Sequence, residues 1–355
     1  MVTIDASAET SQRRASDYAD LLNRIRQAGL MRRRPVYYAI RIAVNASLMV
    51  GGWVAFVLLG DSWWQLLTAA FLAVMFTQTG FLGHDAGHRQ IFRTRRANEI
   101  AGLLHGNLAI GLAYGWWVDK HHRHHVNPNQ EGLDPDISGE TVVFTPDQAR
   151  ARRGFGRFFV HHQGILFVPL LLLEGLNLHV ASVRAVSQPR YRHRGREALL
   201  LALHAAIYIT AVALVLPPGK ALAFVAVQQG LFGLYLGFSF APNHKGMPIL
   251  SADDDMDFLR RQVLTSRNVR GGWLVDGLLG GLNYQIEHHL FPSMPRRSLR
   301  QARPIVRAHC RRIGLPYAET SLFDSYRQAL RYVHQVGRVG RRPAEDAPEA
   351  SVTSR

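Results

Sequence analysis

Residues 39–88 read AIRIAVNASLMVGGWVAFVLLGDSWWQLLTAAFLAVMFTQTGFLGHDAGH and contain two long apolar runs joined at Asp61 and Ser62. A membrane span needs about 20 apolar residues, because a helix rises about 1.5 Å per residue. Four segments meet this requirement: 39–59, 63–82, 198–216 and 221–240. A Pro-Pro-Gly turn at 217–219 joins the second pair. The sequence therefore predicts an all-α integral membrane protein with four transmembrane helices arranged as two hairpins.

Arginine-rich sequences flank both predicted hairpins and set their orientation. They lie at 32–34, 93–96 and 192–196, whereas the two short turns carry little positive charge. Cytoplasmic loops are enriched in Lys and Arg, so we expect a multi-pass protein with both termini in the cytoplasm. Arginine also far outnumbers lysine, which is typical of a GC-rich genome and favours a bacterial inner membrane.

The formal net charge of +16 needs a partner of opposite sign. The sequence lacks a nucleic-acid-binding motif with aromatic platforms, which argues against nucleic acid. The anionic cytoplasmic leaflet of a lipid bilayer is the better partner. The single cysteine, Cys310, excludes an intramolecular disulfide and a cysteine-based zinc site. A metal in this chain would therefore be held by histidine, amide, carboxylate or water.

Composition divides the chain into four parts. Residues 1–38 form a polar, basic cytosolic or interfacial arm, 39–310 the membrane domain, 311–336 a helical cytosolic part and 337–355 a disordered tail rich in Arg, Pro and Glu. The arm is either disordered or helical. In the second case four residues form an apolar stripe on the membrane surface: Tyr18, Leu21, Leu22 and Ile25.

Two further apolar segments, 99–118 and 164–183, are ambiguous. The second contains Glu174, Asn177 and His179, which are costly in hydrocarbon. A crossing there would also place the histidine clusters before and after it on opposite sides of the membrane. We therefore expect both segments to lie in the interface or under a cytosolic cap rather than to span the bilayer.

Three histidine clusters are the main chemical feature of the sequence. They read HDAGH at 84–88, HHRHH at 121–125 and QIEHH at 285–289. The spacing i and i+3 or i+4 places side chains on one face of a helix. Histidine occupies 17 of 355 positions, so clusters of this density are not expected by chance. The pattern predicts a metal site built from imidazoles.

The number of histidines indicates how many metals are bound. Seven imidazoles from three clusters exceed the ligands of one tetrahedral site, so two metals are the economical solution. Imidazole suits Zn, Cu, Fe and Ni. The sequence contains no Glu-x-x-His, His-Glu-x-x-His, Walker A, GxGxxG or GxSxG motif, which removes support for hydrolase and nucleotide-binding functions.

The clusters and their surroundings resemble the membrane fatty acid desaturases. The matching stretches are HDAGH, YGWWVDKHHRHHVNPN at 114–129, GLDPDI at 132–137, FAPNHKGMP at 240–248 and GGLNYQIEHHLFPSMP at 280–295. The resemblance covers about residues 40–310, and Gln285 in the third cluster resembles the front-end branch. The chain carries no HPGG haem motif. The resemblance thus implies a separate electron donor, either cytochrome b5 or a ferredoxin or flavin reductase type.

The resemblance implies a helical cytosolic cap that holds two Fe2+ ions and uses O2 as co-substrate. It implies these metal ligands: His84, His88, His121, His124, His125, His244, His288 and His289. Gln285 would be a further ligand or would orient one, and Asp85, Asp136, Asn243 and Glu287 could orient imidazoles. Tyr114, Trp116 and Trp117 are candidates to line a tunnel for a long acyl chain. Arg296 and Arg297 are candidates for binding an anionic headgroup.

The reaction implied is the introduction of a cis double bond into a long-chain acyl-CoA or acyl-lipid. Two alternatives remain open. A membrane di-iron hydroxylase of alkane, lipid or carotenoid would use the same ligands, because hydroxylation and desaturation diverge after the first hydrogen abstraction. A non-enzymatic metal-binding or metal-transporting membrane protein is the second, although transport ligands usually lie near the bilayer midplane.

Overall fold

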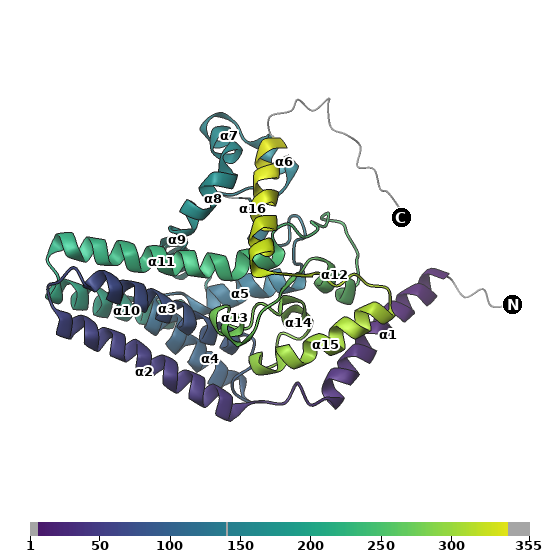
Figure 1. The fold of residues 1–355 in the computed structure, drawn as a ribbon, viewed down its shortest axis with the longest axis horizontal. Helices are drawn as coiled ribbons and strands as arrows, with labels where there is room; N and C mark the ends of the chain where they lie inside the picture. The colour runs from purple at the N-terminus through teal and green to yellow at the C-terminus, as the bar shows by residue number, and fades with distance from the viewer. Residues whose placement is uncertain (1–5, 140, 340–355) are drawn as a thin grey trace.

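The computed structural model describes residues 6–139 and 141–339, which are almost entirely helical. Four long helices lie side by side and a cluster of shorter helices covers one end of them (Figure 1). Within the described ranges the regular sheet is a single parallel pair of two-residue strands, β1 (Asn268–Val269) and β2 (Glu319–Thr320). The predicted all-α class is confirmed.

The four long helices are α2 (Pro35–Leu59), α3 (Gln65–Gly87), α10 (Arg194–Val215) and α11 (Pro218–His244). In the described part of the chain, these are the unbroken helices long and apolar enough to cross a membrane, as predicted. Two of them run past their predicted ends, α3 to Gly87 and α11 to His244. The extra turns carry the first histidine cluster and His244 out of the bundle toward the cap.

Aromatic contacts in the bundle hold the two hairpins together. Phe56 of α2 packs against Phe224 of α11 with ring centroids 4.8 Å apart. Phe76 of α3 meets Phe232 of α11 at 5.7 Å. The outer faces of α2 and α10 expose large apolar side chains such as Leu58 and Leu214, each 81% exposed. That exposure fits a surface in contact with lipid chains.

The 99–118 segment is broken rather than continuous. It comprises the C-terminal part of α4 (Arg95–Leu103), a π-helix η1 (Leu104–Ala109), an irregular stretch and the start of α5 (Tyr114–Val126). Its Ile110 is buried with Phe76 and Phe232 inside the bundle. The freed backbone groups find side-chain partners, because His179 Nδ1 lies 2.9 Å from the Gly111 carbonyl and Ala113 N–H donates to Ser182 Oγ.

The 164–183 segment is also broken. It forms α8 (Gln163–Leu171) and α9 (Glu174–Ser187), whose axes differ by 71°. Helix α9 packs closely along α11, and a Cβ atom at Gly233 would lie only 2.4 Å from the Gly175 nitrogen. Small residues at this crossing let the two backbones approach.

The cap is built from chain segments that precede, separate and follow the four long helices. The N-terminal helix α1 (Ala6–Gln27) packs on the cap helices, and the remaining elements are α6 (Pro146–Ala151), α7 (Gly154–His161), α12 (Phe258–Leu264), α13 (Trp273–Leu278), α14 (Gln285–Leu290), α15 (Arg296–Arg312), α16 (Leu322–Val339) and a 3-10 turn η2 (Pro135–Ile137). Most of the predicted tail, residues 340–355, lies outside the described residues, whereas 337–339 end α16.

The expectation of an apolar stripe on the membrane surface is wrong for the N-terminal arm. Leu21 and Ile25 of α1 are fully buried in an apolar cluster that includes Ile286 of α14 and Leu299 of α15. Tyr18 donates a hydrogen bond to the Leu290 carbonyl at 3.1 Å. The stripe is covered by the cap, so the arm serves as a structural part of the domain that carries the third histidine cluster.

Candidate metal centre

Four elements bring the predicted histidines to one place at the junction of bundle and cap. The end of α3 supplies His84 and His88, α5 supplies the second cluster, α11 ends at His244 and α14 carries the third cluster. Both hairpins place their α3 and α11 ends on the same side, so clusters 200 residues apart in sequence meet. All eight predicted histidines lie in this assembly, with neighbouring ring centroids 4.1–6.3 Å apart.

Among the described residues, the imidazoles fall into two groups whose ligand atoms lie within 4.8 Å of one another. The first contains His84, His88, His121 and His288, and the second His124, His244 and His289. His125 lies between them: its Nε2 is 3.0 Å from His121 Nε2, and its ring stacks on His289 at 4.1 Å. Two adjacent clusters of this kind could each hold a metal ion.

The chemistry of these side chains fits a metal. Burial, followed by the mutual repulsion of neighbouring imidazoles, holds the pKa of His88, His121, His125, His288 and His289 well below the usual histidine range. These rings are therefore neutral, the form that binds metal. In the described part of the chain, the buried Nε2 atoms of His84, His288 and His289 have no hydrogen-bond partner. A cation in each group would satisfy them.

Partners on the other ring nitrogen fix the orientation of several imidazoles. Asp134 places both carboxylate oxygens 3.0 Å from His124 Nδ1, Gln262 Oε1 is 2.9 Å from His289 Nδ1, and the Thr265 carbonyl is 3.0 Å from His244 Nδ1. With Nδ1 engaged, Nε2 is left to face the centre. Burial by itself would lower the pKa of His124, but Asp134 and Asp136 outweigh it and raise that pKa.

Replacing Asp134 with asparagine is expected to lower metal affinity by about 10- to 100-fold. The amide keeps the shape of the carboxylate but loses the charge that orients and polarises the His124 ring. Metal content after dialysis against graded chelator concentrations measures the change. Asp147→Asn provides the control, because that carboxylate is 84% exposed on α6. An Asp134→Asn protein that retains metal as well as the control would contradict this role.

The other predicted polar residues occupy different positions around the centre. The Gln285 amide lies 2.9 Å from His244 Nε2 and accepts a hydrogen bond from Asn243. Asp136 forms an ion pair with Lys120 and lies 3.6 Å from His124 Nδ1. Glu287, by contrast, accepts hydrogen bonds from Asn268 and Tyr317, and burial raises its pKa to about 7. Its hydrogen bonds support the cap rather than an imidazole.

Asp85 and Arg296 form a buried charged pair beside the first group. The Arg296 guanidinium is 2.8 Å from Asp85 Oδ2, and Asp85 Oδ1 is 3.3 Å from His84 Nδ1. Arg296 also donates to the Phe81 carbonyl. The arginine is 6% exposed, so it is not available to an anionic headgroup as the sequence suggested. It instead connects the start of α15 to the metal centre.

The three aromatic candidates for substrate binding separate in space. Trp117 stacks on His121 with ring centroids 4.5 Å apart and also faces His84. Tyr114 lines a cavity of about 290 Å³ that also contacts Gly87, one residue before His88. Trp116 packs against Val186 and Leu201 in an apolar cluster away from the histidines. Trp117 therefore lies against the histidines, Tyr114 lines a nearby cavity, and Trp116 packs in an apolar cluster.

Sequence reasoning missed Asp134, Gln262 and Arg296 as parts of the site. Asp134 lies in GLDPDI, where the sequence suggested Asp136 instead. The Asp-Pro that begins η2 was an available signal, because Asp134 also caps that turn and accepts from the Asp136 nitrogen at 2.8 Å. Gln262 and Arg296 carry no local signal, since their roles depend on contacts with distant elements.

A bundle of four candidate spans with a cap that gathers eight histidines is typical of a multi-pass membrane protein and offers a candidate metal site. The model of the family "Fatty acid desaturase" matches residues 61–321. This range contains all eight histidines and most of the chain. The protein belongs to the fatty acid desaturase family.

Curated relatives support the same assignment. The chain is 30% identical over 338 residues to an acyl-lipid (9-3)-desaturase of Physcomitrium patens, covering 92% of this chain and 62% of the relative. It is 29% identical over 343 residues to a Delta(6)-fatty-acid desaturase of Caenorhabditis elegans, with 92% and 76% covered. It is 36% identical over 264 residues to an acyl-lipid 8-desaturase of Rebecca salina, with 71% and 59% covered. The chain thus spans less than two thirds of the length of the moss and Rebecca relatives.

Proposed function

We propose that this protein is an O2-dependent fatty acyl desaturase that introduces a cis double bond into a long-chain acyl group. The observation that carries the proposal is the pair of mostly buried histidine groups at the junction of bundle and cap. We assign one iron ion to each group, with His125 between them. Iron bound there would supply the oxidising power needed to remove hydrogen from an unactivated CH2 group.

The protein's own residues prepare the site. Asp134, Gln262 and the Thr265 carbonyl hold ring orientation at Nδ1, so that the Nε2 atoms need no rearrangement when metal binds. Trp117 covers His121 and excludes water from that side. The overall reaction consumes O2, two electrons and two protons per double bond and releases two waters. A separate electron donor, cytochrome b5 or a ferredoxin or flavin reductase type, would supply the electrons.

The substrate and the double-bond position are proposed from the relatives. Three are named acyl-lipid desaturases, and others carry Delta(5), Delta(6) and Delta(8) in their names. We therefore propose an acyl-lipid, rather than acyl-CoA, as the substrate, with the double bond placed toward the carboxyl end. The proposed orientation places both termini in the cytoplasm. The bacterial inner membrane stays a prediction, and the relatives named here are eukaryotic.

Heterologous expression with fatty-acid profiling tests the proposed reaction. We expect new cis double bonds, located by mass spectrometry of derivatised lipids, and about two irons per purified chain. Labelled substrate supplied as phospholipid or as acyl-CoA distinguishes the two carriers. Hydroxylated products without new double bonds would favour the hydroxylase alternative. Zinc movement across vesicles without bound iron would favour transport.

Gln285 gives a separate prediction for the second group. Because its amide touches His244, Gln285→Ala is expected to weaken metal binding at that group by about 10-fold or more. Gln285→His is expected to retain both metals, because an imidazole can replace the amide as a ligand. Iron counted per chain for the three proteins checks this. Equal iron in the wild type and Gln285→Ala would show that the amide contributes nothing to binding.

A further inference from the structure

An exposed apolar strip runs along three consecutive helices that are not among the four long spans. On α9, Leu176, Val180 and Val183 follow Leu173 at helical spacing and share one face. The strip has these exposed members: Phe155, Phe158, Ile165, Leu172, Leu173, Leu176, Val180 and Val183. Soluble surfaces rarely expose so many large apolar side chains on consecutive helices, which marks a contact with membrane or protein.

The bend in this element lies beside the membrane-spanning part of α11. Gly175, just after the bend, contacts Gly233 of α11. Gly233 lies about three helical turns before His244, which is roughly 16 Å back toward the outer face. The opposite end of the element is held by the cap, because the Val160 carbonyl and Gln163 pack against Gly337 of α16. The element therefore extends from the cap into the depth of the bundle.

The charges place both ends of the strip on one side of the membrane. Arg152, Arg153 and Arg157 lie at its start, and Arg184 and Arg190 lie at its end. Between residues 158 and 183 the only Asp, Glu, Lys or Arg is Glu174, which accepts a hydrogen bond from Asn177 at the bend. Lys and Arg concentrate in cytoplasmic flanks. Basic residues at both ends indicate a segment that enters and leaves through the cytoplasmic leaflet instead of crossing it.

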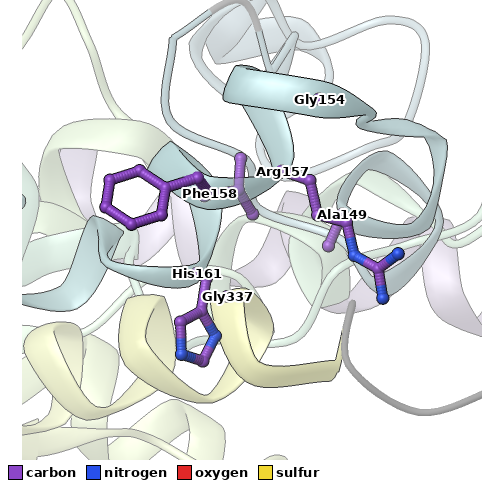
Figure 2. Close-up of a pocket in the computed structure, with 7 residues that line it drawn as sticks. Ala149, Gly154, Arg157, Phe158, His161 and Gly337 are labelled. Atoms are coloured by element: carbon purple, nitrogen blue, oxygen red, sulfur yellow. The ribbon is translucent and has the colours of Figure 1, made fainter.

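A cavity at the start of the strip combines basic and apolar walls. It measures about 340 Å³ and lies between α6, α7 and α16. Arg157, Phe158 and His161 line it together with Gly337, and the Arg157 and Phe158 side chains extend from α7 in different directions (Figure 2). A phospholipid matches these walls, because its phosphate can pair with the Arg157 guanidinium and its acyl chains can pack against the Phe158 ring.

We propose that α7, α8 and α9 form a re-entrant element in the cytoplasmic leaflet, and that Arg153 and Arg157 bind the headgroup of an anionic phospholipid at its start. The occupant of the strip is the bilayer itself, because α9, which carries part of the strip, packs along the candidate span α11. This inference does not depend on the metal or on the reaction.

Single-cysteine labelling tests the depth of the element. The native Cys310 is buried, so spin labels attach selectively to introduced cysteines. The test sites are Phe158→Cys, Leu173→Cys and Val183→Cys. Ile207→Cys, on the exposed face in the middle of α10, and Asp253→Cys on the exposed cap are the matched controls. The protein is reconstituted in phosphatidylcholine vesicles containing 30% phosphatidylglycerol (about one lipid in three), and collisions with O2 and with a water-soluble nickel complex report depth.

We expect the Leu173 label to resemble the Ile207 control and the Phe158 and Val183 labels to lie near headgroup depth. Membrane-impermeant maleimide should reach cysteines at Arg153 and Arg190 from the same, cytoplasmic side. Water exposure at Leu173 equal to that at Asp253 would overturn the re-entrant placement. Labelling of the two flanking sites from opposite sides would establish a fifth crossing and overturn it as well.

A second set of proteins tests the anionic lipid. Each arginine near an anionic surface contributes about 1 kcal/mol. Arg153→Gln combined with Arg157→Gln should therefore lower the ratio of inserted to exposed Phe158 label by about 30-fold. Vesicles of phosphatidylcholine alone should have a similar effect on the wild type. Arg307→Gln, on the exposed face of α15, is the control and should leave the ratio unchanged. A ratio insensitive to both lipid and arginines would overturn headgroup binding.

Discussion

Replacing His124 with alanine is expected to abolish double-bond formation and to lower bound iron. His124 is 4% exposed, its Nε2 faces His244 Nε2 at 3.3 Å, and its Nδ1 is held by Asp134. Loss of an outer partner such as Asp134 costs about 10- to 100-fold, so loss of the imidazole itself should exceed about 100-fold. Fatty-acid profiling and iron analysis of the purified protein measure both effects.

His122→Ala is the matched control for this prediction. His122 belongs to the same HHRHH cluster, two residues from His124, but its side chain is exposed on the opposite face of α5 and joins neither histidine group. It should retain near-normal activity and iron. Membrane insertion should be normal in both variants, because neither substitution changes a span. Equal activity in the two variants would show that position on the helix face does not identify the metal ligands.

Replacing Arg296 with alanine is expected to destabilise the protein by about 3–5 kcal/mol, because it leaves the Asp85 carboxylate buried without its partner. Asp85 is 2% exposed, and the guanidinium also binds the Phe81 carbonyl. At a few degrees per kcal/mol, the melting temperature in detergent should fall by roughly 10 °C. Without Arg296, the Asp85 carboxylate would no longer be held against the His84 ring. Metal release should therefore accompany the loss of stability.

Neighbouring substitutions separate charge from position in this second prediction. Arg297→Ala removes an exposed guanidinium one residue away and should shift the melting temperature by less than about 2 °C. The double variant Asp85→Leu with Arg296→Leu removes both charges and should recover part of the stability, because an apolar pair carries no desolvation penalty. If Arg296→Ala melts like Arg297→Ala, the buried pair does not stabilise the junction of bundle and cap.

The sequence alone determined the spans and the histidines of the site. Apolar runs of sufficient length identify the four long helices, since helix length must match bilayer thickness. The i, i+3 and i+4 spacing places His121, His124 and His125 on one face of α5 without any tertiary information. Charge at the flanks then predicts that the clusters share one side of the membrane. In the fold they meet at one end of the bundle.

Only the tertiary structure decided which polar groups orient the ligands. Asp134 and Glu287 are both carboxylates close to histidines in sequence, yet Asp134 binds His124 while Glu287 binds Tyr317. Likewise, Leu21 and Ile25 form a periodic apolar stripe that could face lipid, but the cap covers it. Helical periodicity states which residues share a face. What that face meets depends on elements folded back from far along the chain, and no local pattern encodes that contact.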